Sequence, residues 1–425
     1  MSAEIKSTLL HQWHVENGAN MAAFGAYDMP LWYPQGAKGE HLAVINSAGL
    51  FDTSHMAVVT VEGDGARVLL QNCFSKDLEH CLGLKKGPLT IGRSAYGLFL
   101  TPEGHVLDDS IVSQVAERFY MVVVNAGMGK GVAEYLAKYK ETLAAEITDL
   151  TDTVGKIDIQ GRNSAKILTR VLKDSDQVFS RFPYFSFKGW YDKSLDIAQT
   201  VLLTDDTPIM LSRTGYTGEF GFEIFVSPEK LVSVWKMLLD AGEDYLLQPC
   251  GLAARDSLRA GAVLPLSHQD IGDWPFANNP WPFALADKGE DGTFTKEFIG
   301  SKALMSLASS DHTLPFAGFD PRKMVVSDKS YVTDGGATNV GVILTCATDM
   351  AIGRVGEEIV SAAPRDGKPE DFVPRGLSCG FIKVNRSFDP GDIVVLTDGK
   401  RKIKVEIRED VRPDRTARWP IKEML

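Results

Sequence analysis

Hydrophobic residues follow two different periods along the first two thirds of the chain. Alternation at every second residue predicts strands, and spacings of three and four residues predict amphipathic helices. We expect strands at residues 57–61, 96–100, 106–115, 119–124, 156–160 and 222–226. We expect helices at residues 5–16, 40–47, 64–74, 128–139, 228–241, 251–260 and 296–307. This order favours antiparallel hairpins with helices packed on one face.

Part of this order occurs twice, which predicts an internal repeat. The strand at residues 156–160 and the helical residues 165–168 echo residues 58–62 and 66–69. In both halves a later strand leads into a longer helix. We therefore expect two related lobes of the same α+β design.

The character of the sequence changes after residue 314, where short β-branched runs are separated by Gly, Asp and Pro. Such runs are typical of a small all-β barrel. We therefore predict an α+β protein with two related antiparallel-sheet lobes and a barrel-like C-terminal domain. The predicted parts are a region at 1–290, in which residues 1–55 combine with 150–290 and residues 56–149 form the other lobe, a linker helix at 291–313 and the barrel at 314–425.

Composition describes an ordinary globular protein and excludes several classes. A net charge of −11 argues against nucleic acid as a partner, because such binders usually carry a basic face. The 5 cysteines include no C-x-x-C pair, which favours reduced thiols in the cytosol. No apolar run approaches the ~20 residues that span a bilayer, and residues 1–14 show no secretory pattern. We therefore expect a cytoplasmic protein without membrane contact.

A glycine-rich stretch, LSRTGYTGEFGFEIFV at residues 211–226, joins two predicted strands through a turn. Alternation along the second strand places Phe222 and Ile224 on one face and Glu223 on the other. A carboxylate among buried neighbours is costly unless a partner meets it, whereas one on a half-exposed strand reaches solvent. The residues alone leave both interpretations of Glu223 open.

Two further carboxylates lie on a predicted hairpin strand, in the sequence VLDDSIV at residues 106–112. The two-residue period places Asp109 with Leu107 and Ile111, and Asp108 on the opposite face. We therefore expect Asp109 on the more apolar side, where burial would raise its pKa unless a donor or cation offsets it. A pair of surface aspartates near a turn is the alternative.

Common cofactor signatures do not occur in the sequence. The strand at residues 122–124 runs into NAGMGKG, but the glycine spacing and the hairpin-linked neighbours do not fit a dinucleotide-binding loop. The 8 histidines show no H-E-x-x-H or paired ligand spacing, so we predict no metal site. Neither a P-loop nor a G-x-S-x-G elbow is present.

The string RTGYTGEFGFE at residues 213–223 resembles the signature of the glycine cleavage T-protein (aminomethyltransferase) family. Other blocks resemble the same family, namely GLFDTSHM at 49–56, VLDDSIV at 106–112, VVNA at 123–126, PYFSF at 183–187 and GLAARDSLR at 251–259. The resemblance extends from about residue 21 to the helix ending near residue 304 and continues more faintly beyond it. It implies three domains around a central channel, with tetrahydrofolate bound inside.

The resemblance also implies a set of folate-binding residues. Glu223 would accept paired N–H donors from the pteridine ring, and Tyr216 and Tyr184 would form aromatic walls for the ring. Arg255 would bind the glutamyl or aminobenzoyl end of the folate, and Asn125 would lie near the channel.

In this family a one-carbon unit passes from an aminomethyl-lipoyl arm to N5 of tetrahydrofolate, and ammonia is released. The resemblance makes Asp109 the catalytic residue, which would orient the folate nitrogen and stabilise or accept charge during the transfer. We therefore predict a tetrahydrofolate-dependent aminomethyltransferase whose partner is a lipoyl carrier similar to the H-protein.

A departure from the family pattern leaves the one-carbon donor open. The segment LSHQDIGDWPFANNPW at residues 266–281 is longer and more aromatic than the family text. With His55, it supplies the residues that we expect on the substrate side, His268, Trp274 and Trp281. Such a composition suits a small methylated cation or an aromatic methyl ether.

A second departure lies in the C-terminal part, where TCATD at residues 345–349 replaces the family's S-G-x-x-S-P element and residues 357–371 form an insertion. Two alternatives to aminomethyl transfer therefore stay open. One is a tetrahydrofolate-dependent demethylase or methyltransferase that acts on a small O-, N- or S-methylated compound. The other is a non-catalytic folate-binding relative.

Overall fold

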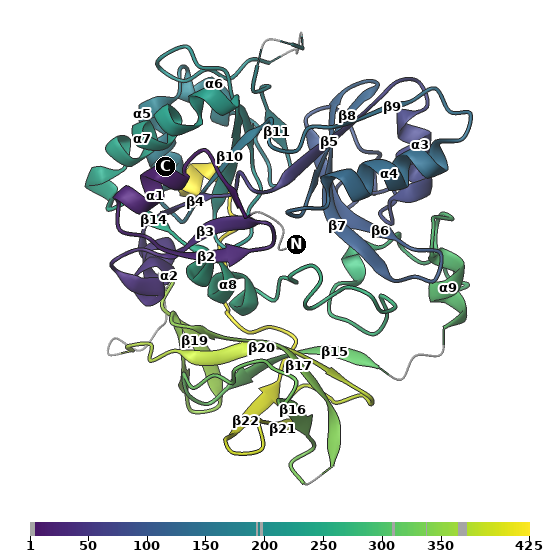
Figure 1. Cartoon of the computed structure of the whole chain (residues 1–425), viewed down its shortest axis with the longest axis vertical. Coiled ribbons are helices and arrows are strands. Elements are labelled where there is room, and N and C mark those ends of the chain that lie inside the picture. Colours follow the sequence, from purple (N-terminus) through teal and green to yellow (C-terminus); the bar gives the residue numbers. More distant parts are fainter. Residues whose placement is uncertain (1–4, 193, 196–198, 308–310, 337, 364–371) are drawn as a thin grey trace.

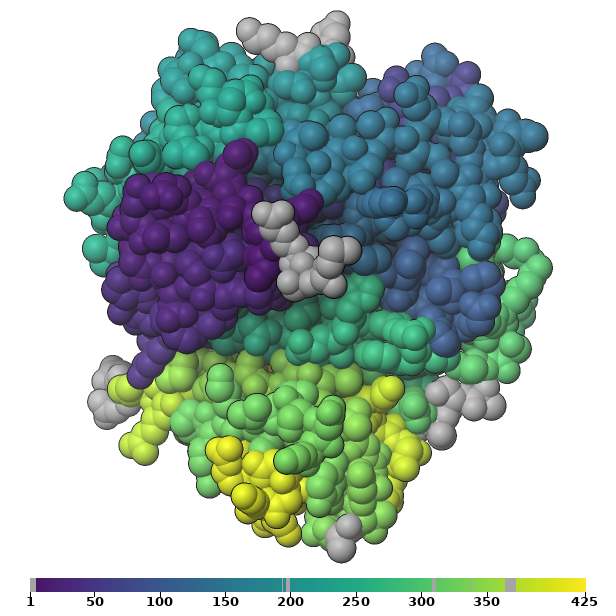
Figure 2. Space-filling view, in the orientation of Figure 1, coloured from purple at the N-terminus to yellow at the C-terminus, as the bar shows by residue number. Residues whose placement is uncertain are grey.

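The computed structural model describes residues 5–192, 194–195, 199–307, 311–336, 338–363 and 372–425. Two α+β lobes lie side by side, and a β-barrel lies across one end of both (Figure 1). The space-filling view shows the same division, with the green and yellow C-terminal part beneath the purple, blue and teal lobes (Figure 2). The predicted α+β class with a C-terminal barrel is confirmed.

The first lobe is built on a sheet to which the described residues contribute six strands, in the order β11-β12-β13-β10-β4-β14. They are β4 (Gly49–Asp52), β10 (Gly155–Gln160), β11 (Phe187–Lys188), β12 (Met210–Ser212), β13 (Gly221–Val226) and β14 (Gln248–Cys250). Alternation on the central strands turns Ile157 and Ile224 toward a core covered by α5 (Ser164–Val171) and α7 (Leu231–Ala241). The opposite face of β10 and β13 carries charged residues and forms half of the site described below.

The second lobe has an antiparallel sheet of five strands within the same described residues, in the order β6-β7-β8-β5-β9. They are β5 (Ala57–Glu62), β6 (Arg93–Leu100), β7 (Val106–Ala116), β8 (Phe119–Val124) and β9 (Glu146–Asp149). Val59 and Val122 are typical of the residues that pack against α3 (Ala66–Cys73) and α4 (Gly129–Lys140). These strands and helices lie close to the predicted ranges, except β9, which the sequence pattern did not predict.

The two lobes are related, and each one contains a strand from the other half of the repeat. β4 directly precedes β5 in the chain but pairs with β10, whereas β9 directly precedes β10 but pairs with β5. The same turn follows β5 in one lobe and β10 in the other, with φ of +120° at Gly63 and +123° at Gly161. A Cβ would come within 2.3 Å of Ala144 O at Gly63 and within 2.4 Å of Ser47 O at Gly161, so only glycine fits at these turns.

The first lobe differs from the predicted antiparallel design at its edge and its start. β14 pairs with β4 in parallel, and β1 (Lys6–Ser7) pairs in parallel with β3 (Tyr27–Trp32). The helix predicted at residues 5–16 is shorter, because residues 6–7 join a sheet instead. The other elements of the first lobe are α1 (His11–Glu16), β2 (Asn20–Phe24), α2 (Gly36–Asn46), α6 (Ser175–Phe179) and α8 (Leu252–Gly261).

The C-terminal part is a closed barrel, β15-β20-β17-β16-β21-β22 in the described residues. Its strands are β15 (His312–Gly318), β16 (Tyr331–Thr333), β17 (Asn339–Asp349), β20 (Leu377–Val384), β21 (Ile393–Thr397) and β22 (Lys402–Ile407), with a hairpin of β18 (Ile352–Val355) and β19 (Glu358–Ser361) beside them. α9 (Ser301–Ser306) precedes the barrel, and 3-10 turns lie at Pro228–Lys230, Glu243–Tyr245, Pro282–Ala284 and Ile421–Glu423. Residues 364–371 of the predicted insertion lie outside the described residues.

A long irregular stretch at residues 262–281, the connecting segment, follows α8 and packs against the second lobe and the barrel. Ile271 and Phe276 from this segment pack in one cluster with Leu98 of β6 and Phe381 of β20. The connecting segment therefore contacts both the second lobe and the barrel, as its length and aromatic content require.

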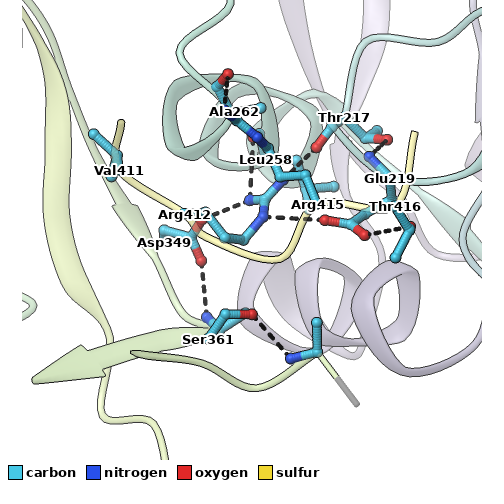
Figure 3. Close-up of polar contacts among 12 residues, drawn as sticks. Thr217, Glu219, Leu258, Ala262, Asp349, Ser361, Val411, Arg412, Arg415 and Thr416 are labelled. Atoms are coloured by element: carbon cyan, nitrogen blue, oxygen red, sulfur yellow. Dashed lines mark hydrogen bonds and ion pairs between the residues drawn. The ribbon is translucent and has the colours of Figure 1, made fainter. Parts of the chain in front are cut away.

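The tail at residues 408–425 leaves the barrel and returns to the first lobe, where Ile421 and Met424 enter the hydrophobic core. Along this path Arg412 is fully buried, with its guanidinium 2.5 Å from Asp349 Oδ2 and 3.1 Å from Glu219 Oε1 (Figure 3). Burial by itself would raise the pKa of Asp349, but Arg412 and His41 together outweigh it and hold this pKa below its usual range. The tail thus ties the barrel to the turn that carries Glu219.

Candidate functional site

Charged residues occupy the face of β10 and β13 that turns away from the core of the first lobe. The antiparallel register places Asp158 directly opposite Glu223, and Lys156 lies on the same face two residues before Asp158. Lys156 Nζ lies 2.6 Å from Asp158 Oδ1 and 3.2 Å from Glu223 Oε1. Because all three side chains are almost completely buried, the lysine compensates two carboxylates that face each other.

Glu223 is held by a second group as well. Its Oε2 accepts a hydrogen bond from Thr214 Oγ1 at 2.7 Å. A carboxylate offers about four lone-pair positions, so both oxygens can still accept further donors. The alternative of a half-exposed surface glutamate is wrong, because Glu223 is only 7% exposed.

Arg255 of α8 extends this cluster toward the glycine turn (residues 213–220). Its Nη1 donates to Asp158 Oδ2 at 2.7 Å, and its guanidinium lies 4.9 Å from the centre of the Tyr216 ring. Burial would raise the pKa of Asp158, but Lys156 and Arg255 outweigh it and lower this pKa. Arg255 therefore links Asp158 to Tyr216, and its role toward the glutamyl or aminobenzoyl end of folate stays a prediction.

The two aspartates of β7 have different surroundings. Asp108 accepts the backbone N–H of Asn125 at 2.9 Å, its Nδ2 at 2.8 Å and the Ser267 hydroxyl at 3.0 Å. Asp109 accepts the Tyr96 hydroxyl at 2.9 Å and Asn125 Nδ2 at 2.8 Å. Asn125 thus bridges the pair, and both aspartates share one network of donors.

The expectation that Asp109 is the more deeply buried of the two is wrong. Asp108 has no exposed surface, because the connecting segment covers it through Ser267. Asp109 is half-buried and keeps an open side that a bound molecule can reach. Burial, followed by the charge of its neighbour, raises the pKa of Asp108, and burial also raises that of Asp109. The pair therefore retains a proton to higher pH than an ordinary aspartate.

The connecting segment brings the aspartate pair close to the glycine turn. The Tyr216 hydroxyl donates to the carbonyl of Pro265, and Ser267, two residues later, donates to Asp108. Two residues span at most ~7 Å of backbone, so Pro265 and Ser267 hold Tyr216 and Asp108 near each other. Burial and the nearby Asp109 raise the pKa of Tyr96 well above its usual value, so this hydroxyl stays a donor to Asp109.

Tyr184, the second predicted aromatic wall, is half-buried between two arginines. The Arg213 guanidinium lies 5.9 Å from the centre of its ring, and that of Arg418 lies 5.8 Å from it. Arg213 is buried, whereas Arg418 is exposed on the C-terminal tail. An exposed cation therefore borders this end of the site.

The structure separates the two histidines expected on the substrate side. His268 is half-exposed, with Nε2 3.8 Å from Asp108 Oδ1. His55 is buried against Phe24, and its Nδ1 has no hydrogen-bond partner among the described residues. Burial lowers the pKa of His55 to about 4, so its ring is neutral at pH 7. Only His268 lies directly beside the aspartate pair.

The two tryptophans of the connecting segment pack toward the barrel. Trp281 is 1% exposed, donates its ring N–H to Val263 O at 2.8 Å and contacts the Phe381 ring at 5.1 Å. Lys383 of β20 lies over Trp274, 4.4 Å from its ring centre. The aromatic content of the segment thus serves packing between the lobes and the barrel, and Trp281 does not form an open wall for a methylated ligand.

Comparison with known proteins gives the family. Residues 10–275 match the family model described as the GCVT N-terminal domain, which is more than half of the chain. An aminomethyltransferase of Symbiobacterium thermophilum is 33% identical over 350 residues, covering 81% of this chain and 86% of the relative. One from Streptomyces coelicolor is 32% identical over 406 residues, covering 94% of this chain and 99% of the relative. The chain belongs to the GCVT family.

A solved structure of the same family has the same fold. The glycine cleavage system aminomethyltransferase T from Bartonella henselae aligns with a TM-score of 0.73 at 24% identity, over 95% of this chain and 97% of that one. The region matched by the GCVT model contains both carboxylate clusters and ends before Trp281. The site therefore lies within the part of the chain that defines the family.

Four residues that contact the predicted carboxylates were not predicted from the sequence. They are Lys156, Asp158, Tyr96 and Ser267. A signal for the first two was present, because Lys156 and Asp158 alternate with Ile157 and Ile159 inside a predicted strand. Charged residues at every second position of a central strand indicate a polar face that other groups must satisfy. Tyr96 and Ser267 reach the aspartates only through tertiary contacts.

Two further features concern only the part of the chain that the structure describes. There, no group of three or more His, Cys, Asp or Glu residues could hold a metal ion. No helix in those residues is both long and apolar enough to cross a bilayer.

Proposed function

We propose that this member of the GCVT family is an aminomethyltransferase that moves a one-carbon unit from an aminomethylated lipoyl carrier to tetrahydrofolate and releases ammonia. The observation that carries the proposal is the pairing of two carboxylate sites, Glu223 on the first lobe and Asp109 on the second, across the connecting segment. A carrier similar to the H-protein is the partner that this activity requires.

The residues around Glu223 fit a pteridine. The carboxylate is fixed by Lys156 and Thr214 but keeps free lone pairs on both oxygens, as paired N–H donors of the ring require. Tyr216, held by Pro265 and flanked by Arg255, offers a flat surface of about the right size for the ring.

The chemistry is assigned to the open aspartate. When bound, tetrahydrofolate supplies the N5 nitrogen that receives the one-carbon unit. Asp109 is held by Tyr96 and Asn125 and has a raised pKa, so it can stabilise positive charge or take a proton at Oδ2. Asp108 keeps Asn125 in place from the buried side.

The glutamate tail of folate needs a cation, and Arg255 is occupied by Asp158. Arg418, exposed beside Tyr184, is the available guanidinium. Arg418→Gln is expected to raise the Kd for tetrahydrofolate by up to about fivefold, the range of one exposed ion pair. Calorimetry with tetrahydrofolate and with a pterin that lacks the tail measures the difference.

The effect of Arg418→Gln should shrink at high salt, because an exposed pair is screened. Arg118→Gln is the matched control, since Arg118 is equally exposed but pairs with Asp64 on the second lobe. Equal losses with tetrahydrofolate and the tailless pterin would exclude Arg418 as the partner of the tail.

The alternative of a demethylase for small methylated compounds rests on the aromatic connecting segment. Trp281 and Phe276 are buried in packing, which removes the main argument for an aromatic grip on such a donor. The proposal is tested first by binding. Purified protein titrated with tetrahydrofolate should show saturable heat, and a protein without measurable affinity for tetrahydrofolate would contradict the proposal.

A further inference from the structure

Lys156 forms an ion pair with the Glu223 carboxylate from inside the protein. Its Nζ donates to Asp158 Oδ1 at 2.6 Å and to Thr53 Oγ1 at 3.2 Å, and it lies 3.2 Å from Glu223 Oε1. An ammonium group has three donors, so two of them are used in hydrogen bonds within the protein. Its side chain is 4% exposed, which fixes the group in this position.

The charge balance of the cluster depends on this lysine. Asp158 and Glu223 are direct cross-strand partners, and like charges in such positions repel each other. Arg255 donates only to Oδ2 of Asp158, at 2.7 Å, whereas Lys156 lies between the two carboxylates. Without Lys156, two buried carboxylates would share one cation that faces only one of them.

We propose that Lys156 is a positioning residue that holds the Glu223 carboxylate in place for the pteridine against the charge of Asp158. This inference rests on the proposed folate-dependent function. In this inference Lys156 does not contact the ligand. The Lys156–Asp158 pair instead sets how strongly Glu223 binds the pteridine.

The other groups around Glu223 do not replace the lysine. On the glycine turn, Thr214 is neutral and Arg213 donates to the carbonyls of Gly221 and of the C-terminal tail. Tyr184 is neutral at pH 7, because burial raises its pKa. Arg415 and Arg418 of the tail lie on the Tyr184 side, and the neutral His55 ring lies on the Lys156 side.

The direct test compares Lys156→Met with the double variant Lys156→Met/Asp158→Asn by calorimetry with tetrahydrofolate. Removing the lysine alone leaves Asp158 directly opposite Glu223 with no cation between them, and like charges in such positions repel. We expect the Kd to rise about tenfold. The double variant removes the opposing charge, and its Kd should return to within about threefold of wild type.

Lys296→Met is the matched control, because Lys296 is also a buried lysine, bound to the carbonyls of Gln71 and Phe74 in the second lobe. It should lower the melting temperature without changing the Kd. If Lys156→Met does not fold, Lys156→Gln, which keeps polar contacts, takes its place in the same comparison.

The inference would be overturned if the single variant bound tetrahydrofolate as tightly as wild type. It would also be overturned if the double variant bound no better than the single one. These outcomes differ from a failure of the proposed function, in which wild-type protein itself does not bind tetrahydrofolate.

Discussion

Asp109→Asn is expected to lower kcat by about 10²- to 10⁴-fold, the range for a residue that handles a proton or charge in the transition state. The Kd for tetrahydrofolate should stay near that of wild type, because the charge is needed mainly in the transition state. Asparagine keeps the shape and can still accept the Tyr96 hydroxyl that holds the side chain. Single-turnover rates and calorimetry on the same preparation separate the two effects.

Asp108→Asn is the matched control for this prediction, because it changes the neighbouring carboxylate of the same pair. It should reduce kcat less, since Asp108 is covered and reaches no ligand. The rising limb of the pH profile should move to lower pH, because the remaining Asp109 no longer titrates beside a like charge. A large loss of kcat in Asp108→Asn, with an unaltered kcat in Asp109→Asn, would show that the catalytic residue has been misassigned.

Glu223→Gln is expected to weaken tetrahydrofolate binding by about 10- to 100-fold, equivalent to about 1.5–3 kcal/mol for a charge-assisted pair. Glutamine keeps the length of the side chain but presents one acceptor and one donor where the pteridine needs two acceptors. Calorimetric titration measures the change directly.

Glu219→Gln is the control for Glu223→Gln, because Glu219 lies on the same turn but pairs with Arg412 of the tail. It should lower thermal stability while leaving tetrahydrofolate affinity close to wild type. Unchanged binding in Glu223→Gln would remove that residue from the site.

The spacing of hydrophobic residues predicted most strands and helices, because each depends on residues close together in sequence. The alternation in β5, β8, β10 and β13 shows directly which side chains enter a core. The predicted division of the chain already groups β4 with residues 150–290, but the pairing of β4 with β10 and of β9 with β5 was not predicted, because a strand's partner depends on contacts distant in sequence. The same limit applies to the parallel pairing of β14 with β4.

The main candidate residues came from long motifs, and their roles stay a prediction. The residues that contact them were not predicted: the structure shows Glu223 beside Lys156 and Asp109 beside Tyr96 and Asn125. The burial of the two aspartates was assigned the wrong way round, because the side of β7 that is covered depends on Ser267, a residue far along the chain. Trp281 was misread for a similar reason, since composition does not tell whether an aromatic residue packs or binds.

The central claim is tested most directly by the products of one incubation. Purified protein is given tetrahydrofolate with an aminomethylated lipoyl carrier and, in parallel, with small O-, N- and S-methylated compounds. The proposed function predicts methylene-tetrahydrofolate and ammonia from the carrier alone. Methyl-tetrahydrofolate from a free methylated compound, with the carrier inert, would contradict it.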